Sequence, residues 1–216
     1  MITIKYHDRN IQKDEYLNIV KPYIKPNTLL LDAGCGEGYN SIISKKIDKK
    51  KVKGTKIIGI DINKKKLEKN PFVDKKILGN INNLSEITNK KFDLIYAEWV
   101  FEHLKHPEKT IIEMQHCLKS DGKIVLLMPN NNNPFIKLNK FLPRKLSIWF
   151  MQKIVKSQRT RDQIFPAYYN LPLKKIKKLN NYFSNIEIYY FNRMGQYFPF
   201  SKVLQNLSNI YENTIR

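Results

Sequence analysis

Short apolar runs that end at turns or acidic residues recur along the first 130 residues of the chain. Each run has the length of a strand and is bounded by polar or turn residues, which is typical of strands buried inside a parallel sheet. We predict five such strands, at 29–32, 56–61, 76–78, 92–97 and 123–128. The β-branched residues of 56–61 add to the strand pattern there.

Helical patterns lie between these runs. We predict helices at 14–20, 39–47, 64–69 and 107–118, the last opened by a proline and ended by Gly122. Strands that alternate with helices form a parallel sheet covered on both faces. The sequence therefore predicts an α/β, doubly wound, mostly parallel fold, in which ligands bind beyond the carboxyl ends of the strands.

The alternation of strands and helices is interrupted after residue 130. Residues 135–156 mix bulky apolar residues with Lys and Arg, and Pro143 interrupts them, so we predict two short amphipathic helices that form a cap rather than a membrane anchor. A helix is expected at 173–182, a strand at 186–191 and a last helix at 203–211. We divide the chain into an N-terminal lid and ligand-binding half (1–130), a helical cap or substrate insertion (131–170), and the C-terminal part of the sheet with its terminal helix (171–216).

The charge of the chain is strongly positive. Its 216 residues carry a formal net charge of +20, from 33 Lys and 6 Arg against 19 acidic residues. The excess of Lys over Arg argues against nucleic acid as the partner, because bidentate phosphate recognition favours the guanidinium group. Residues 131–202 hold 14 Lys and Arg against two acidic residues. A basic face formed by this segment would suit an anionic substrate, peripheral contact with an anionic membrane surface, or RNA.

The compartment is predicted from what the sequence lacks. It has no apolar run of the roughly 18 residues needed to cross a bilayer, and its first residues show no apolar signal segment. The two cysteines, Cys35 and Cys117, are too few for a disulfide framework. We therefore expect a cytoplasmic protein.

A glycine-rich turn follows the first buried run. It reads Leu-Asp-Ala-Gly-Cys-Gly-Glu-Gly over residues 31–38. Glycines let the backbone turn sharply and approach a ligand closely. The spacing departs from Gly-x-Gly-x-x-Gly, because Tyr39 stands where the third glycine would be, and no Gly-Lys-Ser/Thr is present. Asp61 at the end of the next strand makes the turn more informative than glycines alone.

Residues 29–130 resemble the class I S-adenosylmethionine-dependent methyltransferases, in the branch with quinone, sugar and lipid enzymes. The resemblance implies a Rossmann-like sheet and S-adenosylmethionine as cofactor, with S-adenosylhomocysteine as product. In that family Asp32 would position the cofactor's amino group, Asp61 would bind the ribose hydroxyls, and Ile62 would pack on the adenine. The full set of implied cofactor residues is Asp32, Ala33, Gly34, Cys35, Gly36, Gly38, Asp61, Ile62, Asn80, Ile81 and Ala97.

The sequence departs from the family at two places. Asn80 stands where an Asp usually receives the adenine amino group, although its carbonyl oxygen can still accept that hydrogen bond. The family's antiparallel seventh strand is not recognisable after residue 191, so we expect it to be missing or degenerate. A structural alternative also exists for Asp61, which could cap the helix that begins near residue 64.

The segment after the fourth strand is similar to the family's post-strand-four segment and ends in Glu102-His103-Leu104. His103 is our candidate base for an oxygen nucleophile, since histidine usually titrates near neutral pH. Glu98 is a candidate for electrostatic help near the sulfonium. The alternatives are a hydrogen-bonded helix end for His103 and a helix cap for Glu98. No His, Cys and carboxylate spacing suits zinc, so we expect no metal.

The acceptor side is predicted beyond the fifth strand. Asn130 follows that strand, and Arg161, Tyr168 and Tyr169 offer phosphate-binding or stacking groups; either tyrosine could instead be a packing residue. We expect transfer of a methyl group to oxygen of a small-molecule or glycan- or lipid-linked acceptor, and the basic, aromatic cap suggests an anionic one. The alternatives are an RNA methyltransferase that uses the basic 131–202 face and a non-catalytic module that binds S-adenosylmethionine.

Overall fold

The computed structural model describes residues 2–10, 13–131, 133, 143, 145–146, 149, 166–192 and 201–214. The chain divides into two compact units, one of residues 13–128 and one that joins residues 1–12 to 129–216. The break after residue 128 lies close to the boundary expected at 130. The first 12 residues, however, group with the C-terminal part of the chain and not with the ligand-binding half.

The 13–128 unit is built on a five-stranded parallel sheet in the order β4-β3-β2-β5-β6. Its strands are β2 (Leu29–Ala33), β3 (Lys56–Asp61), β4 (Lys75–Leu78), β5 (Phe92–Glu98) and β6 (Leu118–Leu127). All four pairings are parallel. The predicted α/β sheet is thus confirmed, and the strand order reverses beside β2, which is where such sheets bind ligands. In the described part of the chain no antiparallel strand joins this sheet.

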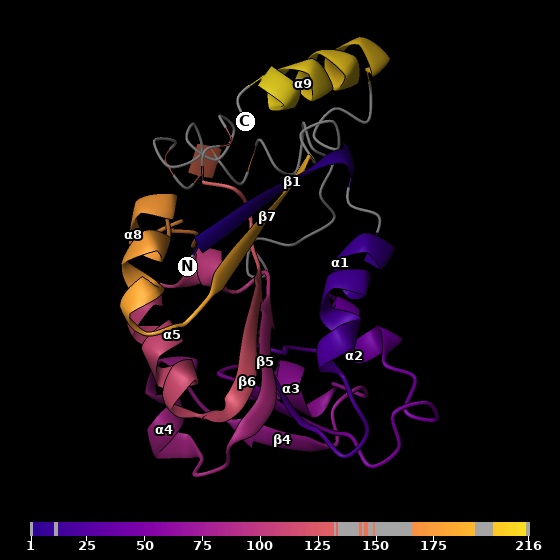
Figure 1. The fold of residues 1–216 in the computed structure, drawn as a ribbon, viewed down its shortest axis with the longest axis vertical. Coiled ribbons are helices and arrows are strands. Elements are labelled where there is room, and N and C mark those ends of the chain that lie inside the picture. Colours follow the sequence, from indigo (N-terminus) through magenta and orange to yellow (C-terminus); the bar gives the residue numbers. More distant parts are fainter. Residues whose placement is uncertain are drawn as a thin grey trace. The chain divides into compact units, whose positions relative to one another are not determined.

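Helices cover both faces of this sheet. Helices α4 (Leu84–Ile87) and α5 (Pro107–His116) lie on one side of it, and α1 (Lys13–Val20) and α2 (Ile42–Lys46) lie on the other (Figure 1). A further short helix, α3 (Lys64–Glu68), follows β3. The core between these layers consists of fully buried side chains, the largest of which are Tyr96, Phe92, Phe101, Leu30, Leu31 and Ile43.

Helix α2 is shorter than the 39–47 that its pattern predicts. It begins after Ser41, whose side chain accepts a hydrogen bond from the Ser44 backbone N–H at 3.1 Å. An N-cap of this kind satisfies one of the unpaired N–H groups of the first turn. The residues between Gly38 and Ser41 are therefore turn, which lengthens the loop after β2.

Strand β6 corrects the prediction at Gly122, which was expected to separate a helix from a strand beginning at 123. The strand begins at Leu118 and runs through Gly122, with an irregularity in its pairing between Phe92 and Leu94 of β5. A Cβ on Gly122 would lie 2.8 Å from the carbonyl oxygen of Phe92. The glycine therefore permits a close approach of two backbones at a bulge rather than ending an element.

The other unit contains a separate two-stranded sheet. Strand β1 (Ile2–Asn10) pairs in parallel with β7 (Ile186–Asn192). The predicted strand at 186–191 is confirmed, but it does not extend the larger sheet. The register pairs Ile2 with Ile186 and Ile4 with Ile188. The N-terminal segment that was predicted as a lid contains this paired strand, and its role as a lid stays a prediction.

The rest of this unit is helical where it is described. Helix α8 (Leu173–Lys178) continues into a 3₁₀ turn, η5 (Leu179–Asn181), and the chain ends with α9 (Lys202–Thr214). These elements match the helices predicted at 173–182 and 203–211. The two cap helices predicted within 135–156 lie outside the described residues. No described helix combines the length and the apolar character needed to cross a membrane.

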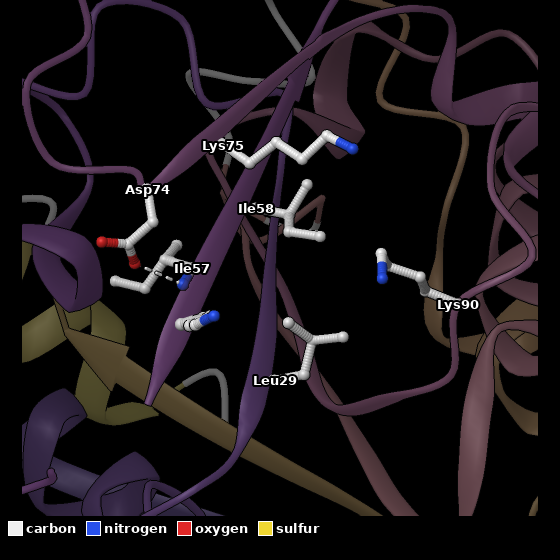
Figure 2. A pocket seen from close by; sticks show the side chains of 7 residues that line it. Leu29, Ile57, Ile58, Asp74, Lys75 and Lys90 are labelled. Atoms are coloured by element: carbon white, nitrogen blue, oxygen red, sulfur yellow. Dashed lines mark hydrogen bonds between the residues drawn. The ribbon is translucent and has the colours of Figure 1, made fainter. Parts of the chain in front are cut away.

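A pocket lies at the amino ends of β2 and β3, at the opposite end of these strands from the glycine-rich turn (Figure 2). Its lining is Leu29, Lys56, Ile57, Ile58, Asp74, Lys75 and Lys90. Asp74 is engaged there by the Ile57 backbone N–H at 2.7 Å and by the Lys49 ammonium. These contacts hold the pKa of Asp74 below its usual range in spite of partial burial.

Candidate functional site

The glycine-rich turn after β2 is held against the end of β3. The backbone N–H groups of Gly34 and Cys35 both donate to the carbonyl oxygen of Ile60, at 2.7 and 3.1 Å. Gly34, Gly36 and Gly38 have φ values of +78°, +49° and +78°. Side chains rarely adopt this left-handed region. Glycine is therefore favoured at all three positions because the backbone of the turn adopts left-handed φ values there.

Gly38 is also enclosed on its outer side. A Cβ at this position would lie 2.5 Å from Asn70 Oδ1 and 2.6 Å from Phe72 Cδ2. Asn70 is buried and ties the turn together, because its Nδ2 donates to the carbonyl oxygens of Cys35 and Gly36 at 3.4 and 3.2 Å. Its Oδ1 accepts from the Phe72 N–H at 2.9 Å. Asn70 therefore fixes the turn from the segment that precedes β4.

Asp61 at the end of β3 faces the same turn. Its Oδ2 accepts from the Gly36 N–H at 2.8 Å, and its Oδ1 accepts from the Asn63 N–H at 2.7 Å. A carboxylate has about four acceptor positions, so each oxygen retains a lone pair for a ligand hydroxyl. The helix cap at α3 is Asn63, which accepts from the Lys66 N–H at 3.1 Å. Asp61 is thus not the cap that the sequence left as an alternative.

The space over Gly36 is open. A Cβ there would meet only Asp61 Oδ2, at 3.9 Å. Beside it Ile62 is a large apolar residue with an exposed fraction of 69%. This open backbone cradle at Gly36, the held carboxylate and the exposed apolar side chain suit a ligand that combines hydroxyl groups with a flat ring, as adenosine does. S-adenosylmethionine therefore fits the residues present.

Asn80 and Ile81 continue this rim after β4. The Asn80 side chain accepts from the Asn82 N–H at 3.0 Å and caps the 3₁₀ turn η2 (Ile81–Asn83). Its carbonyl oxygen keeps a second lone pair for a ligand. Ile81 is buried, so its side chain forms part of the core, and only its backbone suits contact with a ligand.

The segment after β5 closes over the glycine-rich turn. A Cβ on Gly34 would lie 2.7 Å from a methyl group of Val100, so the missing side chain leaves room for Val100. The preceding residue, Trp99, has φ +62°, which is rare for a bulky side chain and concentrates at functional sites. The two segments that the sequence singled out are therefore in contact.

His103 ends the short 3₁₀ turn η3 (Phe101–His103) that follows. Its backbone N–H donates to the Val100 carbonyl at 2.9 Å, and its Nε2 lies 4.0 Å from Glu102 Oε1. The side chain is about one third exposed, at 32%, whereas Glu102 is buried. This arrangement leaves the imidazole accessible at the end of an ordered turn.

Glu98 caps a helix, which was the alternative to a catalytic role in the sequence analysis. Its Oε2 accepts from the Ser41 hydroxyl at 2.8 Å and from the backbone N–H groups of Ile42 and Ile43 at 2.7 and 3.4 Å. It therefore caps the first turn of α2, 56 residues earlier in the chain. Burial raises the pKa of Glu98, and these hydrogen bonds oppose the rise.

Asp32 is buried beneath the turn. Its Oδ2 accepts from the Ser44 hydroxyl at 2.5 Å, and Ser44 also lies 2.6 Å from Tyr96 Oη. Because the Ser44 proton goes to Asp32, Tyr96 donates to Ser44. Burial, with help from the nearby Glu98 carboxylate, raises the pKa of Asp32 to about 7, and the Ser44 hydrogen bond opposes it. An ammonium group at this position would favour the ionised form.

Tyr16 of α1 completes this buried polar cluster. Burial and then the neighbouring Glu98 raise the pKa of Tyr16 well above its usual value. Tyr16 and Glu98 are both buried, and the interaction of their side chains contributes to the raised pKa of Tyr16 and opposes the rise in the pKa of Glu98. The cluster therefore joins α1, β2 and β5 through buried polar side chains.

The raised pKa of Asp32 predicts a pH dependence of stability. The unfolded chain loses this proton near pH 4, while the folded chain keeps it up to about pH 7. The free energy of unfolding therefore falls as pH rises through this window, by about 3 kcal/mol between pH 4.5 and 7. Urea unfolding of the wild type and of Asp32→Asn at both pH values measures the difference. If the free energy of unfolding changes equally with pH in the two proteins, Asp32 makes no such contribution.

The predicted acceptor residues lie in the other unit or outside the described residues. Asn130, Tyr168 and Tyr169 belong to the unit of residues 1–12 and 129–216. The backbone of Tyr169 has φ +50°, and its carbonyl oxygen accepts from Asn131 Nδ2 at 2.9 Å. Arg161 lies outside the described residues. The assignment of these four residues to an acceptor site stays a prediction.

Several site residues were not found from the sequence. They support the turn from neighbouring segments and include Ser41, Ser44, Asn70, Phe72, Tyr96, Trp99 and Tyr16. The one available signal was an Asn before a proline, since Asn70-Pro71 follows α3 by two residues. In the described residues no group of three or more His, Cys, Asp or Glu is arranged to hold a metal ion.

Comparison with known proteins decides the family. A family model described as "Methyltransferase domain" matches residues 7–178, which is most of the chain. The chain belongs to the class I S-adenosylmethionine-dependent methyltransferases. The methyltransferase fold thus accounts for the parallel sheet, the glycine-rich turn and Asp61 together.

Individual relatives of this methyltransferase are distant. The ribosomal protein L11 methyltransferase of Dictyoglomus turgidum is 31% identical over 113 residues, which are 49% of this chain and 34% of that protein. The chain therefore spans about a third of the length of this curated relative. The crystal structure of the plantazolicin methyltransferase BamL, in complex with a triazolic desmethylPZN analog and SAH, matches with a TM-score of 0.56 and 17% identity, over 92% of this chain and 72% of that one. A SAM-dependent methyltransferase from Archaeoglobus fulgidus matches with a TM-score of 0.49 and 18% identity, over 79% of this chain and 68% of that one. The likeness to BamL shows the shared fold.

Proposed function

We propose that this protein transfers a methyl group from S-adenosylmethionine to an oxygen atom of a small-molecule or glycan- or lipid-linked acceptor. The observation that carries the proposal is the open backbone cradle at Gly36, bounded by the held carboxylate of Asp61 and the exposed Ile62. Family membership supports the donor. The basic 131–202 segment, with 14 Lys and Arg against two acidic residues, supports an anionic acceptor.

The residues of the turn would hold the donor. When bound, S-adenosylmethionine supplies a methyl group on a positively charged sulfur, which is already an activated leaving group. Asp61 would accept the two ribose hydroxyls, Ile62 would cover the adenine, and the Asn80 carbonyl oxygen would accept from its amino group. Asp32 lies under the turn, where its carboxylate would orient the ammonium end through charge and through Ser44.

The protein's part in the reaction is then positioning and proton removal. Transfer to oxygen is an in-line displacement, so the rate depends on holding the two reactants at attack distance. His103 would take the acceptor's proton at an imidazole nitrogen, since its ring is accessible and its backbone is fixed by Val100. Glu98 would act by holding the first turn of α2 in place rather than by touching the donor.

Titration calorimetry with S-adenosylhomocysteine tests the donor half of the proposal. We expect a binding heat with one site per chain. Folded protein, verified by circular dichroism, that gives no heat with either S-adenosylmethionine or S-adenosylhomocysteine would contradict the proposal. The acceptor half is tested with methyl-labelled S-adenosylmethionine and a panel of sugar phosphates, polyprenyl-phosphate-linked sugars and phenols, in which label should enter a hydroxyl group.

Replacing His103 with glutamine is expected to lower kcat about a hundredfold on the acceptor so identified, because the general base is lost. Affinity for S-adenosylhomocysteine should change less than about twofold, since His103 is not placed on the donor. His116→Gln, an exposed histidine near the end of α5, is the matched control and should keep kcat unchanged. A kcat for His103→Gln that equals the wild type would assign His103 a structural role only.

A further inference from the structure

The C-terminal helix α9 presents an apolar stripe to solvent. Its spacing of i, i+1, i+4, i+7 and i+8 puts the five apolar side chains on one face of the helix. All five are exposed, with exposed fractions between 37% and 69%. They are Val203, Leu204, Leu207, Ile210 and Tyr211.

Among the described polar residues of α9, Ser208 is covered. Ser208 is buried at 5% exposure, and its hydroxyl donates to the Gln205 carbonyl at 2.7 Å. Gln205 is itself half-buried. An ordinary surface helix buries its apolar stripe and exposes its polar residues. In α9 the apolar stripe is exposed instead, and a contiguous exposed apolar stripe marks a surface that contacts a partner or a membrane.

We propose that α9 lies in the interface of an anionic lipid bilayer, with its apolar stripe toward the acyl chains. This goes beyond the proposed methyl transfer and does not depend on it. No described helix is long and apolar enough to cross a bilayer, so the contact would be peripheral. Lys202 at the start of the stripe and Tyr211 at its end are residue types that favour the boundary between lipid and water.

Charge complementarity favours an anionic membrane over other occupants. Residues 129–216 carry 15 Lys and Arg against three acidic residues. In the same unit α8 contributes Lys174, Lys177 and Lys178, all exposed, and has no acidic residue. Basic groups near an anionic surface add to apolar insertion, which by itself binds weakly. A second copy of this chain carries the same net charge of +20, so long-range repulsion between like charges opposes self-association.

Vesicle sedimentation tests this proposal on the 216-residue chain. We expect the wild type to sediment with vesicles of equal parts phosphatidylglycerol and phosphatidylcholine at low salt, and much less with phosphatidylcholine alone. Substituting both Leu207→Gln and Ile210→Gln should weaken binding about tenfold or more, because two apolar side chains leave the acyl boundary. Both positions are exposed, so the fold and melting temperature should stay unchanged.

The control variant is Asn206→Gln, which introduces the same side chain one residue away on the exposed polar side. It should bind vesicles as the wild type does. Equal binding by the double variant would overturn the proposal, because general basicity would then explain the attraction. Failure of the wild type to sediment with the anionic vesicles would overturn it as well. A dimer in light scattering that the double variant dissociates would assign the stripe to a contact between two copies instead.

Discussion

Replacing Asp61 with alanine is expected to weaken the binding of S-adenosylhomocysteine by about a hundredfold or more. The variant would lose the two charge-assisted hydrogen bonds that we propose between Asp61 and the ribose, each worth about 1.5 kcal/mol or more. It also releases the Gly36 and Asn63 N–H groups, which Asp61 holds at 2.8 and 2.7 Å. The donor site would therefore lose the carboxylate that binds the ribose and also the hydrogen bonds that hold the turn at Gly36 in place. Calorimetry on the folded variant measures the loss.

The matched control for Asp61 is Asp74→Ala. Asp74 likewise accepts from a backbone N–H, that of Ile57 at 2.7 Å, but it lies at the amino ends of the strands, in the pocket of Figure 2. A general loosening of the sheet would affect both variants, whereas a role in ribose binding affects Asp61 alone. Wild-type affinity in Asp61→Ala would remove the ribose assignment and, with it, the main support for the donor site.

Alanine at Gly38 is expected to be the most destabilising single change in the turn. The substitution forces a side chain into φ +78° and places a Cβ 2.5 Å from Asn70 Oδ1 and 2.6 Å from Phe72. The left-handed conformation costs about 1 to 2 kcal/mol, and displacing buried neighbours adds about 1 to 3 kcal/mol. We expect the free energy of unfolding to fall by about 3 kcal/mol, measured by urea denaturation, with binding impaired as a consequence.

Gly36→Ala separates stability from binding. Its φ of +49° carries a backbone cost of about 1 to 2 kcal/mol, but a Cβ there would meet only Asp61 Oδ2 at 3.9 Å. The added methyl group would stand in the space assigned to the donor. This variant should therefore lose more affinity than stability, the reverse of Gly38→Ala. If Gly36→Ala binds S-adenosylhomocysteine as tightly as the wild type, the donor does not lie over Gly36.

The apolar runs of the sequence were sufficient to predict the five-stranded sheet. Strands β2, β3 and β5 are buried on both faces, so apolar residues follow one another along each of them instead of alternating with polar ones. Such a strand can be recognised from its own residues. The glycines and Asp61 were also recognisable, because a tight turn at the end of a buried strand requires particular residue types at fixed positions. In these places the local sequence and the fold agree.

The sequence was least informative where a local signal has more than one structural use. Gly122 was taken as the break between two elements, but it lies inside β6, where its missing side chain admits the Phe92 carbonyl. Glu98 could have been a catalytic carboxylate or a cap, and nothing near it in the sequence identifies Ser41 and Ile42 as its partners. The strand at 186–191 was predicted correctly, yet its partner is β1, almost the whole chain away.

The sequence by itself therefore determined the strands, the glycine-rich turn and the candidate donor residues, since these depend on backbone conformation and on burial along a single segment. Only the tertiary structure decided which distant side chains meet. The cluster of Tyr16, Asp32, Glu98 and Tyr96 draws on three elements, and its pKa shifts come from burial that no single segment specifies. The exposure of the α9 stripe is likewise a property of the folded chain and not of the helical pattern. A helical pattern shows that an apolar face exists, whereas the contacts of the folded chain determine whether that face is covered.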